Sequence, residues 1–160
     1  MQKTNALRML ERAGVPCRTA EYPASPTDPP SGVQAAALLG LDAGSVYKTL
    51  VTEGAPDAHF VFVIPVAREL DLKKAAHAVG EKKLVMLPQK KLLPLTGYVH
   101  GGCSPVGMKK TFPTVLDLSA EGKDRIWFSA GRIGMQVEVS PADLPRALSF
   151  IYAPVTAERD

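Results

Sequence analysis

The stretch HFVFVIPV, residues 59–66, constrains the fold of this chain more than any other segment. After His59 the run is entirely apolar, and its valine and phenylalanine content indicates a strand. A strand without polar alternation is typical of the middle of a sheet. Just upstream, VYKTLVT at 46–52 is β-branched and aromatic and predicts a second strand, with EGAPDA as the turn between them. We therefore expect a sheet that contains this pair.

Helix signals alternate with further strand signals along the chain. Thr4 is placed to cap a helix that runs to about Ala13, Ser31 and Gln34 form a capping-box pattern, and Asp71 precedes the helical sequence LKKAAHAV. Interleaved helices and strands, including one hairpin, predict an α/β protein with a mixed sheet or a partly closed barrel and flanking helices. The other expected strands lie at 17–22, 83–87, 114–118, 125–130 and 134–140, and a short helix is expected to start at 140–143.

Length and composition restrict the class of protein. With 160 residues, 46% of them hydrophobic and 22% charged, the chain is expected to form one domain over 1–160. No segment approaches the roughly 18 apolar residues of a membrane span. The N-terminal stretch MQKTNALRMLERAG is too charged for a secretory signal, and two cysteines do not make a disulfide framework. These features predict a cytoplasmic protein with no membrane partner.

Common catalytic and cofactor motifs do not occur in the sequence. HExxH, CxxC and GxSxG are missing, and His59, His77 and His100 lack metal-ligand spacing. A Walker A loop fails because Met108 stands where the lysine is required. No helix-turn-helix signature or basic arm indicates DNA binding. We therefore expect no metal, no cofactor and no DNA partner.

The segment GGCSPVGMKK, residues 101–110, is the strongest candidate for a binding loop. Its glycines let the backbone approach a ligand closely, and successive N–H groups in such a loop can form a nest for oxygen anions. Lys109 and Lys110 would add charge for a phosphate. A tight loop between two strands explains the same composition equally well.

Paired lysines recur along the chain, although its net charge is only +3. Pairs that share one face of the molecule would suit a phosphate backbone. Pairs on separate, solvated helix faces would have no common function, and we favour that interpretation for most of them. The pairs lie at 73–74, 82–83, 90–91 and 109–110.

Lys48 is the candidate catalytic side chain. Because side chains alternate along a strand, Val46, Lys48 and Leu50 share one face, and the lysine lies between two apolar neighbours. If that face lines a cleft, the ammonium can hold a phosphate or carbonyl oxygen. The alternative is an edge-strand lysine that prevents aggregation.

Other polar and small residues flank these two features. LTGYVH at 95–100 precedes the glycine loop and offers hydroxyl, main-chain and imidazole contacts. A second small-residue turn at 129–134 is a hairpin connection unless it faces the glycine loop. Tyr22, at the end of the first strand, is a pocket residue or a partly buried aromatic. Cys103 has the chemistry of a nucleophile, but no partner base is recognisable.

Five motifs in a fixed order resemble the YbaK/EbsC family, the free-standing relatives of the editing domain inserted in bacterial prolyl-tRNA synthetase. They are VYKTLV, PVARELDLKKAA, LTGY, GGCSPVGMKK and SAGRIG, and the similarity spans roughly residues 4–159. The resemblance implies a mixed, barrel-like sheet with surrounding helices. It also implies an aminoacyl-tRNA deacylase that acts in trans on the acceptor end of a misacylated tRNA, with cysteine on the proline tRNA as the foremost substrate.

The same resemblance implies a site that contains few catalytic side chains. In YbaK-like enzymes the substrate's own thiol is thought to attack its ester carbonyl, giving a cyclic thiolactone and free tRNA. The protein then orients the aminoacyl group and stabilises the oxyanion. Lys48 is the implied catalytic residue and holds the terminal-adenosine phosphate or neighbouring oxygens. The implied substrate-binding residues are Tyr22, Ser31, Thr96, Gly97, Tyr98, Gly101, Gly102, Ser104, Pro105, Gly107, Ser129, Gly131 and Gln136.

Two positions depart from the family pattern. Relatives often carry phenylalanine at the position of Ser31, and aspartate at that of Gln136, where a carboxylate would pair with the substrate's α-ammonium. The preferred amino acid is therefore open, and alanine or serine, removed by water attack, is the second option. A non-catalytic tRNA-binding or regulatory module is the third. A ternary complex with prolyl-tRNA synthetase is the further partner that the resemblance implies.

Overall fold

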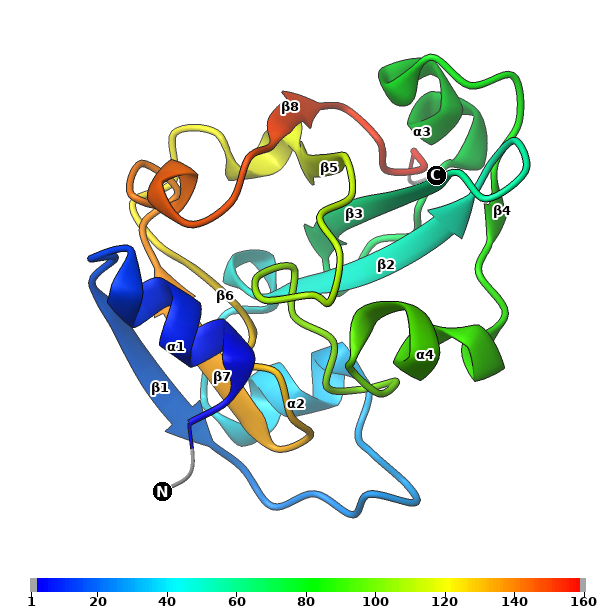
Figure 1. Cartoon of the computed structure of the whole chain (residues 1–160). Coiled ribbons are helices and arrows are strands. Elements are labelled where there is room, and N and C mark those ends of the chain that lie inside the picture. The colour runs from blue at the N-terminus through cyan, green and yellow to red at the C-terminus, as the bar shows by residue number, and fades with distance from the viewer. Residues whose placement is uncertain (1–2, 159–160) are drawn as a thin grey trace.

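Two β-sheets form the framework of the computed structural model, which describes residues 3–158 (Figure 1). The larger sheet has the strand order β4 (Val85–Met86), β2 (Tyr47–Glu53), β3 (His59–Pro65), β5 (Thr114–Asp117) and β8 (Ile151–Ala153). The smaller sheet has the order β1 (Cys17–Glu21), β7 (Met135–Val139) and β6 (Ile126–Ser129). Each strand predicted from the sequence is present, with bounds shifted by at most a few residues.

The larger sheet is mixed, as expected, but the sheets do not close into a barrel. β2 pairs antiparallel with β3 and β4, whereas β5 runs parallel to β3 and β8. The smaller sheet is antiparallel, and within residues 3–158 its one backbone bridge to the larger sheet joins Trp127 to Val46. The edge strands β4 and β8 have two and three residues, too few to carry the pairing round to the smaller sheet. The expected mixed α/β fold with flanking helices is confirmed, with the refinement that the two sheets stay open and do not close into a barrel.

Local capping signals place the helices. The Thr4 hydroxyl accepts from the Leu7 N–H at 3.2 Å, Ser31 forms the predicted capping box, and the Asp71 carboxylate accepts from two backbone N–H groups. At the expected 140–143 helix the chain forms only a 3-10 turn, Leu144–Arg146. None of the helices between residues 3 and 158 is long and apolar enough to span a membrane. The helices are α1 (Asn5–Arg12), α2 (Gly32–Leu38), α3 (Leu72–Val79) and α4 (Leu92–Thr96).

β3 is buried on both faces, as its apolar sequence predicts. Phe62, Val63 and Ile64 have no exposed surface. Phe62 and Ile64 belong to a cluster that contains the alanines of α3, whereas Val63 belongs to the cluster of α1 and the smaller sheet. Full burial of such a side chain stabilises the fold by about 1.5–3 kcal/mol. This core fixes the position of the neighbouring strand β2, which carries Lys48.

Asp117 ties the end of β5 to the C-terminal segment. Its side chain is 5% exposed, and its carboxylate accepts from the backbone N–H groups of Ser119 and Val155, each at 3.1 Å. Asp117→Ala leaves both donors unpaired, so we expect the free energy of unfolding in a urea titration to fall by about 2–4 kcal/mol. The exposed Asp124→Ala is the control and should change it by less than about 0.5 kcal/mol. Similar losses in both variants would contradict this role.

Candidate active site

Six of the predicted site residues line one cavity of about 330 Å³. The cavity lies where β2, the start of α2, the smaller sheet and the loop after α4 meet. The six predicted residues are Tyr22, Ser31, Lys48, Gly101, Ser129 and Gln136. The remaining lining residues are Pro30, Gly32, Ala35, Tyr47, Thr49, Leu50, Val66, Leu92, His100 and Cys103.

Lys48 brings an unpaired positive charge to this cavity. On its face of β2, Val46 packs into a cluster with Trp127, and Leu50 packs against the cluster under α3. Lys48 lies half-buried between them, and its ammonium forms no hydrogen bond or ion pair within residues 3–158. β4 pairs with β2 only at Thr52 and Glu53, so within residues 3–158 the strand pairing at Lys48 is with Ile64 of β3, and the topology does not decide against the edge-strand alternative. The cation is therefore free to bind a ligand oxygen.

Two buried oxygen atoms in the cavity wall have no hydrogen-bond partner. They are Thr49 Oγ1 on β2 and Gln136 Oε1 on β7, and Gln136 is only 7% exposed. Leaving a buried polar atom unpaired costs about 1–3 kcal/mol. A water molecule or a ligand group that reaches such an atom would satisfy it. Both atoms can accept from an ammonium group, and no lining residue of the cavity is an aspartate or glutamate.

The glycine loop and the second small-residue turn are in direct backbone contact. A Cβ built on Gly102 would lie 2.7 Å from the Ile133 nitrogen and 2.8 Å from the Arg132 carbonyl carbon. No side chain fits at that separation, so glycine is required for the close approach. Gly101, with φ +87°, packs on the other side against Pro29. The turn at 129–134 therefore faces the glycine loop, as the binding interpretation requires.

The backbone of this loop provides donors near the cavity. Within the described part of the chain, the N–H groups of Gly101 and Cys103 donate to no acceptor. The Gly102 N–H is used internally, since it donates to the Val99 carbonyl at 3.0 Å. The loop therefore offers two separated donors to an anion rather than a continuous series.

Tyr98 holds the two loops together outside the cavity lining. Its hydroxyl donates to the Val106 carbonyl at 2.7 Å. A Cβ on Gly107 would lie 2.7 Å from that hydroxyl, and one on Gly131 would lie 3.0 Å from the tyrosine ring. These three residues have a packing role in this structure. Their assignment as substrate contacts stays a prediction.

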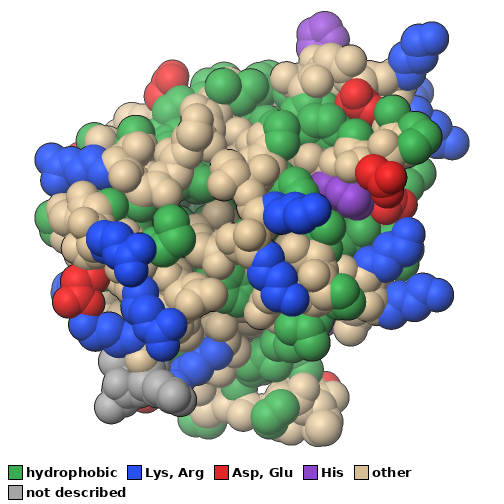
Figure 2. Space-filling view, viewed as in Figure 1, with side chains coloured by type: hydrophobic (Ala, Val, Ile, Leu, Met, Phe, Trp, Pro, Cys, Tyr) green, Lys and Arg blue, Asp and Glu red, His purple; other side chains and the backbone are tan. Residues whose placement is uncertain are grey.

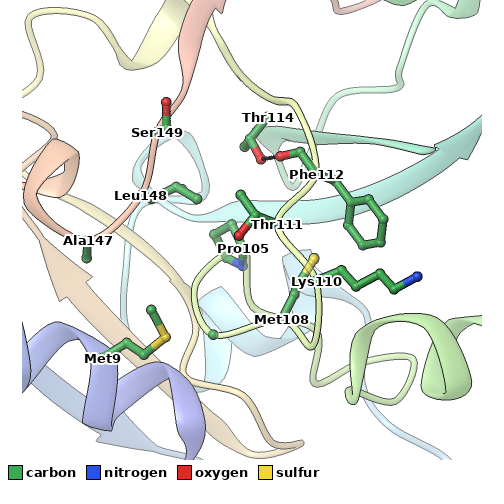
Figure 3. Close-up of a pocket in the computed structure, with 11 residues that line it drawn as sticks. Met9, Pro105, Met108, Lys110, Thr111, Phe112, Thr114, Ala147, Leu148 and Ser149 are labelled. Carbon is green, nitrogen blue, oxygen red and sulfur yellow. Dashed lines mark hydrogen bonds between the residues drawn. The ribbon is translucent and has the colours of Figure 1, made fainter. Parts of the chain in front are cut away.

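Other predicted residues also lie outside the cavity lining. The Thr96 hydroxyl donates to the Leu92 carbonyl at 2.8 Å and accepts from the Tyr98 N–H, so it closes the end of α4. Gly97 is the C-cap of α4, Gly102 makes the loop contact, and the Ser104 hydroxyl accepts from the Val106 N–H. Pro105 and Gly107 line a separate cavity of about 80 Å³, shown in Figure 3. Substrate contact by these residues also stays a prediction.

Cys103 lines the cavity but is not activated. Its side chain is buried, and burial raises the pKa of the thiol to about 12, against a smaller opposite effect of its hydrogen bond with Thr96. The thiol is therefore protonated at neutral pH, and a thiol is a much weaker nucleophile than a thiolate. Burial therefore does not activate Cys103 as a nucleophile, and its side chain forms part of the cavity wall.

Thr49 is the main lining residue that sequence patterns miss. It directly follows Lys48 in a strand where threonine is an ordinary β-branched residue. That its hydroxyl is buried without a hydrogen-bond partner depends on how the strands pack in three dimensions, which the local sequence does not reveal. Leu92 and Ala35 complete an apolar part of the wall, and no local pattern distinguishes them from core residues.

Alkaline pH should destabilise the protein through this region. Burial raises the pKa of Cys103 from 9.0 to about 12 and that of Tyr98 from 10.0 to about 12. Both groups bind their protons more tightly when folded, so the stabilisation is complete below pH 9 and is lost as the pH rises toward 12. Each group contributes a slope of up to about 1.4 kcal/mol per pH unit. In urea titrations between pH 9 and 11, Cys103→Ala and Tyr98→Phe should each reduce the slope, and unchanged slopes would refute this.

Comparisons with known proteins show the family to which the chain belongs. Residues 30–147 match the family model of the aminoacyl-tRNA editing domain. EbsC of Enterococcus faecalis, named as a candidate Cys-tRNA(Pro)/Cys-tRNA(Cys) deacylase, is 45% identical over 157 residues, covering 98% of this chain and 95% of the relative. The proline–tRNA ligase of Shouchella clausii is 32% identical over 109 residues, which are 68% of this chain and 19% of that enzyme.

The fold agrees as well. A solved structure described as a candidate trans-editing enzyme for prolyl-tRNA synthetase superposes with a TM-score of 0.84 at 26% identity, covering 99% of this chain and 100% of the other. The resemblance that the five motifs indicate is thereby confirmed. The chain belongs to the aminoacyl-tRNA editing domain family.

Proposed function

We propose that this aminoacyl-tRNA deacylase acts in trans and removes cysteine that has been attached to the proline tRNA. The observation that carries the proposal is the pairing, in one cavity, of an unpaired lysine with two unpartnered buried oxygens. An aminoacyl ester at a tRNA end has the complementary groups, an α-ammonium and nearby phosphate oxygens. The name and 45% identity of EbsC support cysteine as the amino acid.

The cavity has the dimensions and polarity for the aminoacyl end of a tRNA. Its volume of about 330 Å³ is near the lower limit for sites that enclose a small molecule. Gln136 Oε1 and Thr49 Oγ1 accept from the α-ammonium, and Lys48 holds a phosphate or neighbouring oxygen. The free N–H groups of Gly101 and Cys103 are the donors available to the ester oxygen as it gains negative charge.

The nucleophile in this proposal belongs to the substrate. The cavity lining contains no carboxylate, and its one thiol, Cys103, is held protonated by burial. A cysteinyl thiol lies within reach of its own ester carbonyl, and such intramolecular attack gains greatly from proximity. The sulfur–carbon bond forms, the ester carbon–oxygen bond breaks, and the thiol proton passes to the ribose oxygen. The products are a cyclic thiolactone and free tRNA.

Partners and location follow from this substrate. The acceptor end of a misacylated tRNA is the main partner, and the similarity to a proline–tRNA ligase supports a ternary complex with prolyl-tRNA synthetase. We place the protein in the cytoplasm, where tRNA is charged. The alternative of a non-catalytic tRNA-binding module predicts binding without turnover.

Removing either the Lys48 ammonium or the Gln136 side-chain oxygen should impair deacylation without unfolding the protein. Lys48→Met keeps the apolar stem but removes the ammonium, and we expect kcat/KM for Cys-tRNA(Pro) to fall about 100-fold or more. Gln136→Leu removes the ammonium acceptor and should raise KM about tenfold. Lys73→Met, at an exposed position on α3, is the matched control and should leave both constants unchanged. Wild-type rates in the two cavity variants, with unchanged melting temperatures, would disprove this assignment.

The identity of the nucleophile can be tested with matched substrates. We expect Cys-tRNA(Pro) to be deacylated about 100-fold faster than Ala-tRNA(Pro) or Ser-tRNA(Pro), because only the thiol attacks efficiently within the substrate. Mass spectrometry of quenched reactions should detect cysteine thiolactone. Equal rates for the three substrates would favour water attack and the alanine or serine alternative. If all three stay intact, with or without prolyl-tRNA synthetase, the enzymatic proposal is wrong.

A further inference from the structure

The positive charge of the chain is concentrated in one segment. Residues 82–116 contain six lysines and no aspartate or glutamate. The other 125 residues contain 13 basic and 16 acidic residues, so the surplus of +3 for the whole chain comes from this segment alone. A charge distribution of this kind is the electrostatic signature of a surface that binds an anionic polymer.

The same segment forms one side of the active-site cavity. Leu92 at the start of α4 and His100, Gly101 and Cys103 in the loop after it all line the cavity. Four of the six lysines, those at 90–91 and 109–110, flank these lining residues in the sequence, whereas those at 82–83 follow Glu81 beside the turn between β2 and β3. Figure 2 shows Lys and Arg side chains around the position that α4 occupies in Figure 1.

Three lysines of this segment border α4 and are exposed. The stem of Lys109 packs over Gly97 at the end of α4, and its ammonium lies 3.4 Å from the Pro94 carbonyl. Figure 3 shows the neighbouring Lys110 side chain extending away from the small cavity, on the side where α4 lies. Lys90 lies in the turn that leads into α4. Lys91 differs from these three, because its ammonium is 3.5 Å from the Glu53 carboxylate.

We propose that Lys90, Lys109 and Lys110, the α4 lysines, bind phosphates of the tRNA acceptor stem while the aminoacyl end occupies the cavity. The ammonium groups of Lys90 and Lys110 have no partner within residues 3–158, and that of Lys109 has only its long contact with a carbonyl. Lysine–phosphate contacts of this kind fix the position of a nucleic acid and carry no sequence information. The inference rests on the proposed function, since it names the surface that delivers the substrate.

The salt dependence of tRNA binding tests this surface. The probe is a fluorescently labelled tRNA(Pro) transcript, and anisotropy gives its Kd between 50 and 200 mM KCl. Each lost phosphate contact reduces the slope of log K against log salt by about 0.7–0.9. The triple variant K90Q/K109Q/K110Q should therefore show a slope smaller by about 2–3 than wild type. The arginine triple variant, which keeps the charge, should retain the wild-type slope.

A charge-matched control separates this surface from general electrostatics. K73Q/K82Q/K83Q removes three exposed lysines on and just after α3, near the turn between β2 and β3 and at the far end of β2 from Lys48. The control should retain the wild-type slope. Equal slopes in the two glutamine variants would overturn the proposal.

Deacylation assays distinguish failure of this surface from failure of the proposed function. The K90Q/K109Q/K110Q variant should lose activity on Cys-tRNA(Pro) about tenfold or more. It should keep the wild-type rate on a cysteinyl ester of adenosine, because that substrate has no acceptor stem. Equal losses of activity on both substrates would contradict the proposal that the α4 lysines bind the acceptor stem. A wild-type protein that leaves both substrates intact would refute the proposed function, while the binding slopes would still decide whether the α4 lysines hold tRNA.

Discussion

The contact between Gly102 and the Arg132–Ile133 backbone is the constraint on which the site depends. It joins the loop that follows α4 to the turn between β6 and β7, and a Cβ at residue 102 would come within 2.7 Å of a backbone nitrogen. Because backbone meets backbone, neither loop can move aside by changing a rotamer. Tyr98 reinforces the contact, because its hydroxyl donates to Val106 in the glycine loop and its ring lies against Gly131 in the turn. The donors of the glycine loop are thereby held at a fixed distance from Gln136 on β7, which pre-organises the cavity.

Much of the fold could be predicted because it depends on local signals. The caps at Thr4, Ser31 and Asp71, and the apolar run of β3, are readable from a few adjacent residues. β8 could not be predicted in this way, because its three residues pair in parallel with β5, which lies over thirty positions earlier, and Ile151 is 53% exposed. α4 is five residues long and contains a proline. Closure of the sheet depends on the lengths of edge strands, which no single segment encodes.

The site was predictable only in part, for a related physical reason. Lys48 stands out because lysine is unusual between apolar neighbours in a strand, and the glycine loop stands out by composition. Gln136 and Ser31 were expected from the resemblance alone. Tyr98 and Gly131 look like site residues in the sequence, yet they pack against each other outside the cavity lining. Composition indicates that a close backbone approach will occur, but not whether a ligand or another loop makes it.

A cavity lined by no carboxylate and no activated thiol has consequences for selectivity. If the nucleophile comes from the substrate, a prolyl ester in the same cavity has no thiol and does not react, so rejection of the cognate amino acid requires no tight steric fit. The cavity wall therefore does not have to exclude proline by its shape. Under the proposed mechanism, the small Ser31 and the neutral Gln136 in the cavity wall affect how firmly the aminoacyl group is held and leave the reacting groups in place. Under the proposed mechanism, selection by substrate chemistry accounts for a cavity that combines polar atoms able to orient the ester with a buried, protonated thiol.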